Sequence, residues 1–161
     1  MPRARLRQAT LDDLATLVRQ RRRMFEHMGA TDAALLDEAD RLYRRWARAR
    51  LKSGKLVGFL VEERGEAVAG GCVWLQPVQP RPHALVTEQP YILSMFTEPA
   101  HRGKGHASRI VRAAVQWARE RGYPRISLHA SEEGRSVYER LGFEPTTEMR
   151  LKLDAPRRRR G

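Results

Sequence analysis

The sequence predicts an α/β protein, in a layered α+β arrangement, and two observations carry this prediction. Segments with the apolar period of helices occur together with shorter apolar or alternating segments typical of strands. A glycine-rich stretch at residues 102–107 separates one strand-like segment from one helical segment. At 161 residues the chain can bury a real core, and we expect a single domain at 1–155 with a basic, disordered tail at 156–161.

Two helices are expected first. Residues 10–13 read Thr-Leu-Asp-Asp, a capping box that opens a helix ended by Gly29. A longer helix begins at about residue 31, continues to about residue 52 and has Gly54 as its stop. Both segments carry apolar residues at helical spacing, so each should bury one face.

Two strands follow, at residues 56–63 and 67–76, joined by a tight Arg-Gly turn. The pair Gly70 and Gly71 predicts a β-bulge in the second of these strands. Residues 77–90 contain four prolines and no clear period, so a loop is expected there.

The second half of the chain should begin with a strand–loop–helix unit that contains the glycine-rich stretch. Its expected elements are a strand at 91–97, a helix from 107 to Gly122, a strand at 125–130, a short helix at 133–141, and a last strand with alternating Met149, Leu151 and Leu153. The last strand is expected because apolar and charged residues alternate strictly there.

Charge and composition narrow the class of protein. Lys and Arg outnumber Asp and Glu by 31 to 19, and the net charge of +12 favours a polyanionic partner. Nucleic acid is not expected, because no zinc spacing, aromatic sheet signature or basic heptad accompanies the charge. The single cysteine, Cys72, excludes an intrachain disulfide and indicates a cytoplasmic protein. No apolar run reaches about 18 residues, so no membrane partner is expected.

The glycine-rich stretch predicts an anion site. A turn between a strand and a helix leaves backbone N–H groups unpaired at the positive end of the helix, and Arg102 and Lys104 add fixed charge. A Walker A motif is excluded, because Glu98 and Gly105 stand where it needs Gly and Ser or Thr. A dinucleotide fingerprint is disfavoured by Ser108, which takes the place of a glycine or alanine.

A third motif, Arg/Gln-x-x-Gly-x-Gly/Ala, is matched at Arg102, Gly105 and Ala107. A second match follows at residues 137–143, Val-Tyr-Glu-Arg-Leu-Gly-Phe. On these residues the chain resembles the GNAT superfamily of acetyl-CoA-dependent N-acyltransferases. The resemblance covers about residues 3–153.

The resemblance implies the GNAT fold, a central mixed, twisted sheet with helices on both faces and a V-shaped splay between two parallel central strands. Those strands would be residues 91–97 and 125–130. It also implies acetyl-CoA as the acyl donor, with its pyrophosphate on the backbone N–H groups of residues 103–107. The pantetheine arm would pair with the backbone of residues 95–97.

The resemblance assigns roles residue by residue. The expected cofactor-binding residues are Met95, Phe96, Thr97, Arg102, Gly103, Lys104, Gly105, His106, Ala107, Ser108 and Ser131. Tyr138 takes the place of the family's tyrosine acid, whose phenol protonates the departing thiolate. Ser131 stands where many relatives carry an asparagine and can donate only one hydrogen bond. The side chain of His106, where an aliphatic residue is commoner, is expected to face solvent.

The group that takes the proton from the amine is left open. Glu88, Tyr91, Ser94 and His129 all lie on or near the two splayed strands, and an ordered water is the alternative. For His129, on the opposite face of its strand from its neighbours, a solvent or packing role is favoured.

Two further residue types are expected to play no chemical part. His27, His83 and His101 show no metal-ligand spacing with any Cys, Asp or Glu cluster, so no metal is expected. Cys72 lies in a predicted core strand and is expected to be inert.

The sequence therefore predicts an N-acetyltransferase that moves the acetyl group from acetyl-CoA to a primary amine by direct attack in a ternary complex. The alternatives are a catalytically silent acetyl-CoA-binding sensor of the same fold and, less favoured, a basic nucleic-acid-binding protein. Small polyamines, antibiotics, amino acids and protein N-termini all fit as small-molecule or peptide acceptors. A homodimer is compatible with the resemblance.

Overall fold

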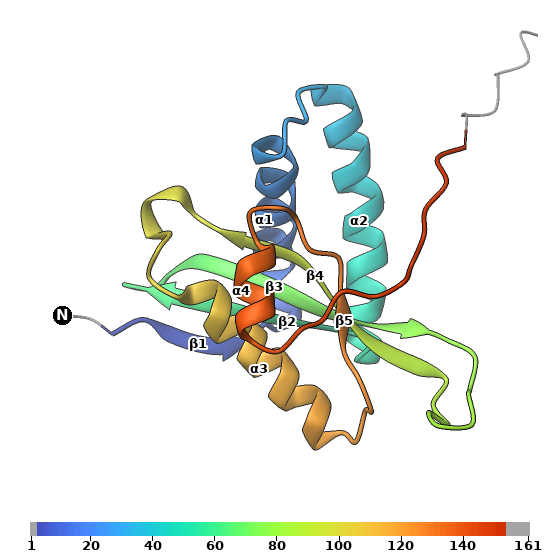
Figure 1. Cartoon of the computed structure of the whole chain (residues 1–161). Helices are drawn as coiled ribbons and strands as arrows, with labels where there is room; N and C mark the ends of the chain where they lie inside the picture. Colours follow the sequence, from blue (N-terminus) through green and yellow to red (C-terminus); the bar gives the residue numbers. More distant parts are fainter. Residues whose placement is uncertain (1–2, 154–161) are drawn as a thin grey trace, which may run out of the picture.

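The computed structural model describes residues 3–153, so the predicted tail at 156–161 lies outside the described residues (Figure 1). Its elements are β1 (Arg5–Gln8), η1 (Leu11–Asp13), α1 (Leu14–His27), α2 (Ala33–Ser53), β2 (Leu56–Glu63), β3 (Glu66–Pro77), β4 (Glu88–Thr97), η2 (Pro99–His101), α3 (His106–Glu120), β5 (Ser127–Leu128) and α4 (Arg135–Arg140). The strands form one mixed sheet in the order β1-β2-β3-β4-β5. The α/β fold predicted from the sequence is confirmed.

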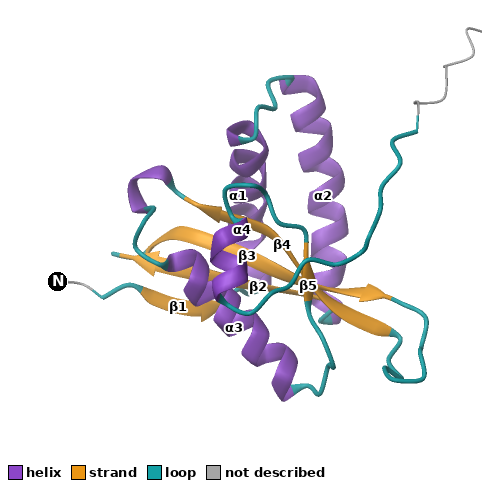
Figure 2. Cartoon of the chain, in the orientation of Figure 1, coloured by secondary structure: helices purple, strands orange, loops and turns teal. Residues whose placement is uncertain are grey.

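Helices cover both faces of this sheet, with α1 and α2 on one side and α3 and α4 on the other (Figure 2). Alternate residues of β2 divide between two cores: Val57, Phe59 and Val61 pack with α3, whereas Leu56 and Leu60 pack with α1 and α2. A strand whose side chains point alternately to two apolar layers must be apolar throughout, as β2 is over most of its length.

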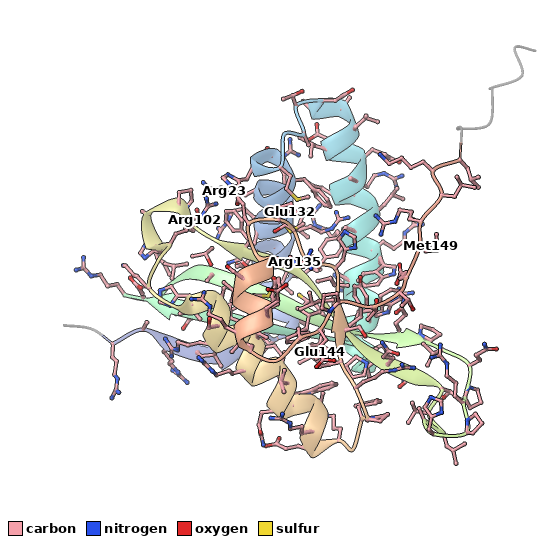
Figure 3. All side chains as sticks on the ribbon, in the orientation of Figure 1. Arg23, Arg102, Glu132, Arg135, Glu144 and Met149 are labelled. Atoms are coloured by element: carbon pink, nitrogen blue, oxygen red, sulfur yellow. The ribbon has the colours of Figure 1, made fainter. Side chains whose placement is uncertain are left out.

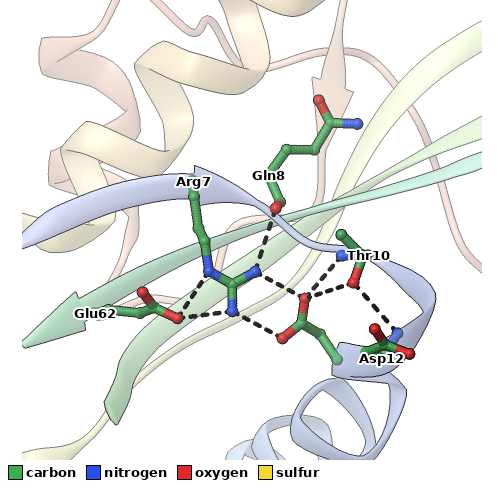
Figure 4. A network of polar contacts seen from close by, with 6 residues as sticks. Arg7, Gln8, Thr10, Asp12 and Glu62 are labelled. Atoms are coloured by element: carbon green, nitrogen blue, oxygen red, sulfur yellow. Dashed lines mark hydrogen bonds and ion pairs between the residues drawn. The ribbon is translucent and has the colours of Figure 1, made fainter. Parts of the chain in front are cut away.

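The predicted capping box is confirmed. The Asp12 N–H donates to Thr10 Oγ1 at 3.3 Å, and the Thr10 N–H donates to the Asp13 carboxylate at 2.7 Å. Arg7 of β1 clamps this turn by binding both Asp13 oxygens at 2.8 Å and Glu62 of β2 at 2.7 Å (Figure 4). The Arg7 guanidinium lowers the pKa of the Asp13 carboxyl to about 2.

The central strands part as expected. β4 and β5 are parallel and share only two pairs of residues, Tyr91 with Ser127 and Ile92 with Leu128. β4 continues to Thr97, so its backbone at residues 93–97 has no strand partner on this side among the described residues. Backbone N–H and C=O groups along an unpaired strand edge are available to a ligand that lies in the opening.

The predicted bulge lies at the expected level of the sheet, but its extra residue belongs to the neighbouring strand. Two residues of β4, Ser94 and Met95, stand opposite Gly71 of β3, and the flanking pairs are Cys72 with Leu93 and Gly70 with Phe96. Ser94 has φ +57°, the left-handed conformation typical of a bulge. The bulge therefore turns β4 just where it leaves β5.

The two adjacent glycines are needed for close approach. A Cβ atom on Gly71 would lie 2.2 Å from Met95 Sδ, and one on Gly70 would lie 2.0 Å from Gln20 Oε1. The Met95 and Gln20 side chains thus pack against β3 on opposite faces. A residue larger than glycine at position 71 or 70 would displace them.

Four predictions of strands and loops need correction. The strand expected at 125–130 is formed only at Ser127–Leu128. The four-residue strand β1 was not predicted, because so short a segment shows no clear period. The connection between β3 and β4 is shorter than expected, since β4 begins at Glu88. The predicted last strand is not formed: Met149, Leu151 and Leu153 are 94%, 82% and 82% exposed. The alternating apolar side chains of this segment are not buried because β5, with two residues, offers almost no edge to pair with.

No helix within residues 3–153 is long and apolar enough to cross a membrane.

Candidate functional site

The glycine loop, residues 102–105, joins η2 to α3 beside the open end of β4. Gly103 and Gly105 have φ +75° and +78°, and a Cβ atom at either position would meet no neighbour within 4 Å. Glycine is needed there for backbone conformation alone. No described side chain caps α3, so the N–H groups of its first turn remain free for an anionic ligand.

Arg102 holds the loop against the end of β4. Its Nε donates to the Thr97 carbonyl at 3.1 Å, and its guanidinium lies over the Phe96 ring at 6.0 Å. Arg23 of α1 lies over the same ring at 5.7 Å, and Figure 3 shows both arginines at the same end of the sheet. The phenyl ring thus supports two cations at the mouth of the opening.

Lys104 and His106 face away from the opening, toward the end of β2. His106 is only 4% exposed, and its Nε2 lies 2.8 Å from Glu63 Oε1. The expectation that the His106 side chain faces solvent is therefore wrong, because the first turn of α3 packs onto β2 and a carboxylate receives the imidazole. Lys104 Nζ lies 3.4 Å from Glu63 Oε2, so its charge is partly met within the protein.

Of the three β4 residues predicted to bind the pantetheine arm, Met95 and Phe96 turn their side chains into the protein. The Phe96 side chain is buried, whereas Thr97 is half-buried at the strand's end. Their backbone lies beyond the last β4–β5 pair. The edge is consequently available through the main chain, with the Thr97 carbonyl shared with Arg102.

Tyr138 lies on α4, on the other side of the opening. Its ring meets Phe143 edge-on with centroids 6.0 Å apart, and burial raises the pKa of its phenol above the usual value. The phenol is therefore protonated at neutral pH. A Cβ atom on Gly134 would lie 3.0 Å from the Tyr138 ring, so glycine at this position leaves room for it.

Ser131 and Tyr138 come together around Gly134. Ser131 Oγ accepts a hydrogen bond from the Gly134 N–H at 3.1 Å, and it lies 3.2 Å from where a Gly134 Cβ would be. The Ser131 hydroxyl hydrogen remains available to one acceptor. Ala107 and Ser108 lie in the first turn of α3.

A surface groove of about 860 Å³ runs beside α4. Tyr138, Leu128 and His129 line it together with the segment around Met149. The glycine loop and residues 95–97 do not line it. The groove therefore reaches one side of the opening, and the anion site lies outside it.

The candidate proton acceptors are spread along the two strands. Glu88 pairs with Lys55 and accepts from the Tyr123 hydroxyl at 3.4 Å, at the end of β4 away from the glycine loop. Burial raises the pKa of Tyr91. His129 is exposed and lies 3.4 Å from Arg150, in agreement with a solvent-facing side chain.

Two residues of the site surroundings, His27 and Glu63, were not predicted. His27 Nε2, at the end of α1, lies 3.2 Å from Arg102 Nη1 and accepts its hydrogen bond, so it ties the glycine loop to α1. Glu63 binds residues at both ends of the glycine loop. Contacts between positions 38 to 75 residues apart carry no local sequence signal.

Cys72, by contrast, is buried as expected, and burial raises the pKa of its thiol to about 12.

Known proteins share this arrangement. The family model described as "Acetyltransferase (GNAT) family" matches residues 15–143. The crystal structure of a GCN5-related N-acetyltransferase from Ralstonia eutropha JMP134 is similar with a TM-score of 0.85 and 34% identity, over 94% of this chain and 99% of that one. A predicted acetyltransferase from Clostridium acetobutylicum, crystallised with acetyl-CoA, gives a TM-score of 0.85 and 30% identity, over 94% of this chain and 96% of that one.

Curated sequences give a shorter match. An uncharacterized N-acetyltransferase of Methanocaldococcus jannaschii is 29% identical over 110 residues, which are 65% of this chain and 45% of that protein. The chain thus spans about half the length of the curated relatives it matches.

Proposed function

The chain belongs to the GNAT acetyltransferase family, and from this premise we propose that it moves the acetyl group of acetyl-CoA to a primary amine by direct attack in a ternary complex. One observation supports this most strongly: the uncapped first turn of α3 adjoins the unpaired edge of β4. An anion site next to free strand backbone suits a ligand with a pyrophosphate and an amide-containing arm.

In this proposal the pyrophosphate lies on the backbone N–H groups of Gly103 to Ala107. Arg102 and Lys104 contribute positive charge, although Lys104 also contacts Glu63. The pantetheine arm pairs with the backbone of residues 95–97, and Ser131 donates one bond to it. Each hydrogen bond to the charged pyrophosphate is worth about 1.5–3 kcal/mol.

The transfer forms a C–N bond and breaks the C–S bond of the thioester. The amine must first lose a proton, because a free alkylamine has a pKa of about 10.4. A backbone N–H near Met95 or Phe96, where the bulge turns β4, stabilises the tetrahedral oxyanion. Tyr138, which keeps its phenolic proton, then donates it to the departing thiolate.

A coupled assay of thiol release over classes of amine tests the reaction. Release of free coenzyme A that depends on one amine class, with recovery of the acetylated amine, is the expected result. Acetyl-CoA binding without thiol release from any amine would favour a cofactor-binding sensor instead. Absence of acetyl-CoA binding would contradict both.

A further inference from the structure

Three side chains with metal-binding atoms meet at the outer edge of the glycine loop. Glu63 is the last residue of β2, His101 ends η2, and His106 is the first residue of α3. His101 Nδ1 lies 2.9 Å from Glu63 Oε2, and His106 Nε2 lies 2.8 Å from Glu63 Oε1. One ligand atom from each residue lies within 4.8 Å of the others.

The cluster already binds one cationic group, the ammonium of Lys104. Lys104 Nζ lies 3.4 Å from both Glu63 Oε2 and His101 Nδ1. The Lys104 side chain is 49% exposed, so it can leave without disturbing the core. A metal ion would take the place of an ammonium group that reaches the cluster from solvent.

We propose that Glu63, His101 and His106 form a binding site for a divalent cation of the Zn²⁺ class, which on binding displaces Lys104 and joins both ends of the glycine loop to β2. Two imidazole nitrogens and one carboxylate oxygen are a donor set that suits Zn²⁺. A water from the exposed side would complete a tetrahedral shell.

The three ligand atoms would move closer together on metal binding. Ligand atoms around a tetrahedral Zn²⁺ lie about 3.3 Å apart when each bond is about 2.0–2.1 Å. The two short contacts end on different Glu63 oxygens, so only one of them joins two ligand atoms when a single oxygen binds the metal. The ligand atoms lie up to 4.8 Å apart, and the longer separations would close by up to about 1.5 Å on metal binding. His101 and Glu63 are 28% and 20% exposed, so their side chains can make this adjustment while the buried His106 ring stays fixed.

Burial of the His106 ring makes metal binding cost some free energy. When Nε2 binds a metal, the ring proton must sit on Nδ1, which has no hydrogen-bond partner among the described residues. One unsatisfied buried N–H costs less than a three-ligand zinc site supplies, so binding remains favourable. The inference does not depend on the proposed acetyl transfer, since the metal is tested alone.

Titration of untagged, metal-free protein with Zn²⁺ against a chromophoric chelator, and with Co²⁺ as a visible-absorption probe, tests the site. We expect one equivalent of metal and a tetrahedral Co²⁺ spectrum. His101→Asn and Glu63→Gln should each weaken binding by about 100-fold or more, because losing even an outer partner of a metal ligand costs about 10–100-fold. Lys104→Gln should bind metal more tightly than the wild type, since it removes the competing cation.

His83→Asn is the matched control, because His83 is an exposed histidine in the β3–β4 connection, and it should bind metal like the wild type. Circular dichroism and thermal melting in EDTA establish that each variant is folded. The proposal is overturned if the wild type takes up no stoichiometric metal, or if His101→Asn and Glu63→Gln bind as tightly as the wild type.

Discussion

The two sides of the opening between β4 and β5 are built very differently. On one side, the glycine loop is tied to β2 through Glu63, to β4 through Thr97 and to α1 through His27. On the other side, β5 contributes two paired residues, and the segment that follows α4 is exposed. The side proposed to hold the pyrophosphate is therefore firmly tied to the sheet, whereas the side proposed to carry the acid is more loosely packed.

If the loosely packed side supplies the acid, Tyr138→Phe should lower turnover strongly while leaving acetyl-CoA affinity nearly unchanged. General acid catalysis contributes about 10²–10⁴-fold, and the variant loses only the phenolic oxygen. Steady-state kinetics and calorimetry measure the two quantities. Tyr123→Phe, whose hydroxyl contacts Glu88 instead, is the control. Equal losses of turnover and affinity in Tyr138→Phe would argue for a packing role.

Stability should differ sharply between the two sides. Ile110→Ala removes a side chain that is 1% exposed on α3 and should lower the free energy of unfolding by about 2–5 kcal/mol. Leu151→Ala, at a residue that is 82% exposed, should change it by less than about 0.5 kcal/mol. Urea unfolding checks both values. A large loss in Leu151→Ala would mean that the C-terminal segment packs on the sheet, as the sequence alternation predicts.

Two glycine variants can distinguish an effect of the glycine loop on cofactor binding from the effect of backbone strain on stability. Gly105→Ala should cost about 1–2 kcal/mol of stability because a side chain is strained at φ +78°, and it should also weaken acetyl-CoA binding. Gly122→Ala, at φ +75° beyond the other end of α3, carries the same strain without contact to the anion site. Thermal melting and calorimetry on both variants test this. Equal cofactor affinities in the two variants would contradict a role for the loop.

A pH-dependent effect is expected at the clamp between β1 and η1. The pKa of Asp13 is lowered from 3.8 to about 2, mainly by the hydrogen bond from Arg7. A depressed folded-state pKa contributes stability that is present above the unfolded value and is lost as pH falls toward the folded one. Arg7→Gln should therefore cost at most about 2 kcal/mol at neutral pH. This difference from the wild type should shrink between about pH 4 and pH 2 in chemical unfolding experiments.

Local signals predicted most of the fold. The capping box at Thr10, the stop at Gly54 and the strand β2 all depend on neighbours within a few residues, and the structure has each of them. The last strand failed for the opposite reason, since alternation defines a face but cannot supply a partner strand. The placement of the bulge on β4 also needed the register of two strands.

The sequence indicates candidate site residues only within short motifs. The glycine loop can be recognised from consecutive residues and their flanks. Glu63, by contrast, reaches His101 and His106 across 38 and 43 positions, so no spacing rule brings them together. His106 is buried because it contacts Glu63, and since the sequence does not reveal that contact, the expectation of a solvent-facing side chain was wrong.

The central claim is that the glycine loop holds the pyrophosphate of coenzyme A. Calorimetry with acetyl-CoA and with S-acetylpantetheine, which keeps the thioester arm but lacks the pyrophosphate together with the phosphorylated adenosine, tests it. We predict that acetyl-CoA binds about 100-fold or more tightly than S-acetylpantetheine, since several charge-assisted hydrogen bonds are lost with the pyrophosphate. Equal affinity for the two compounds, or no binding of acetyl-CoA, would contradict the claim.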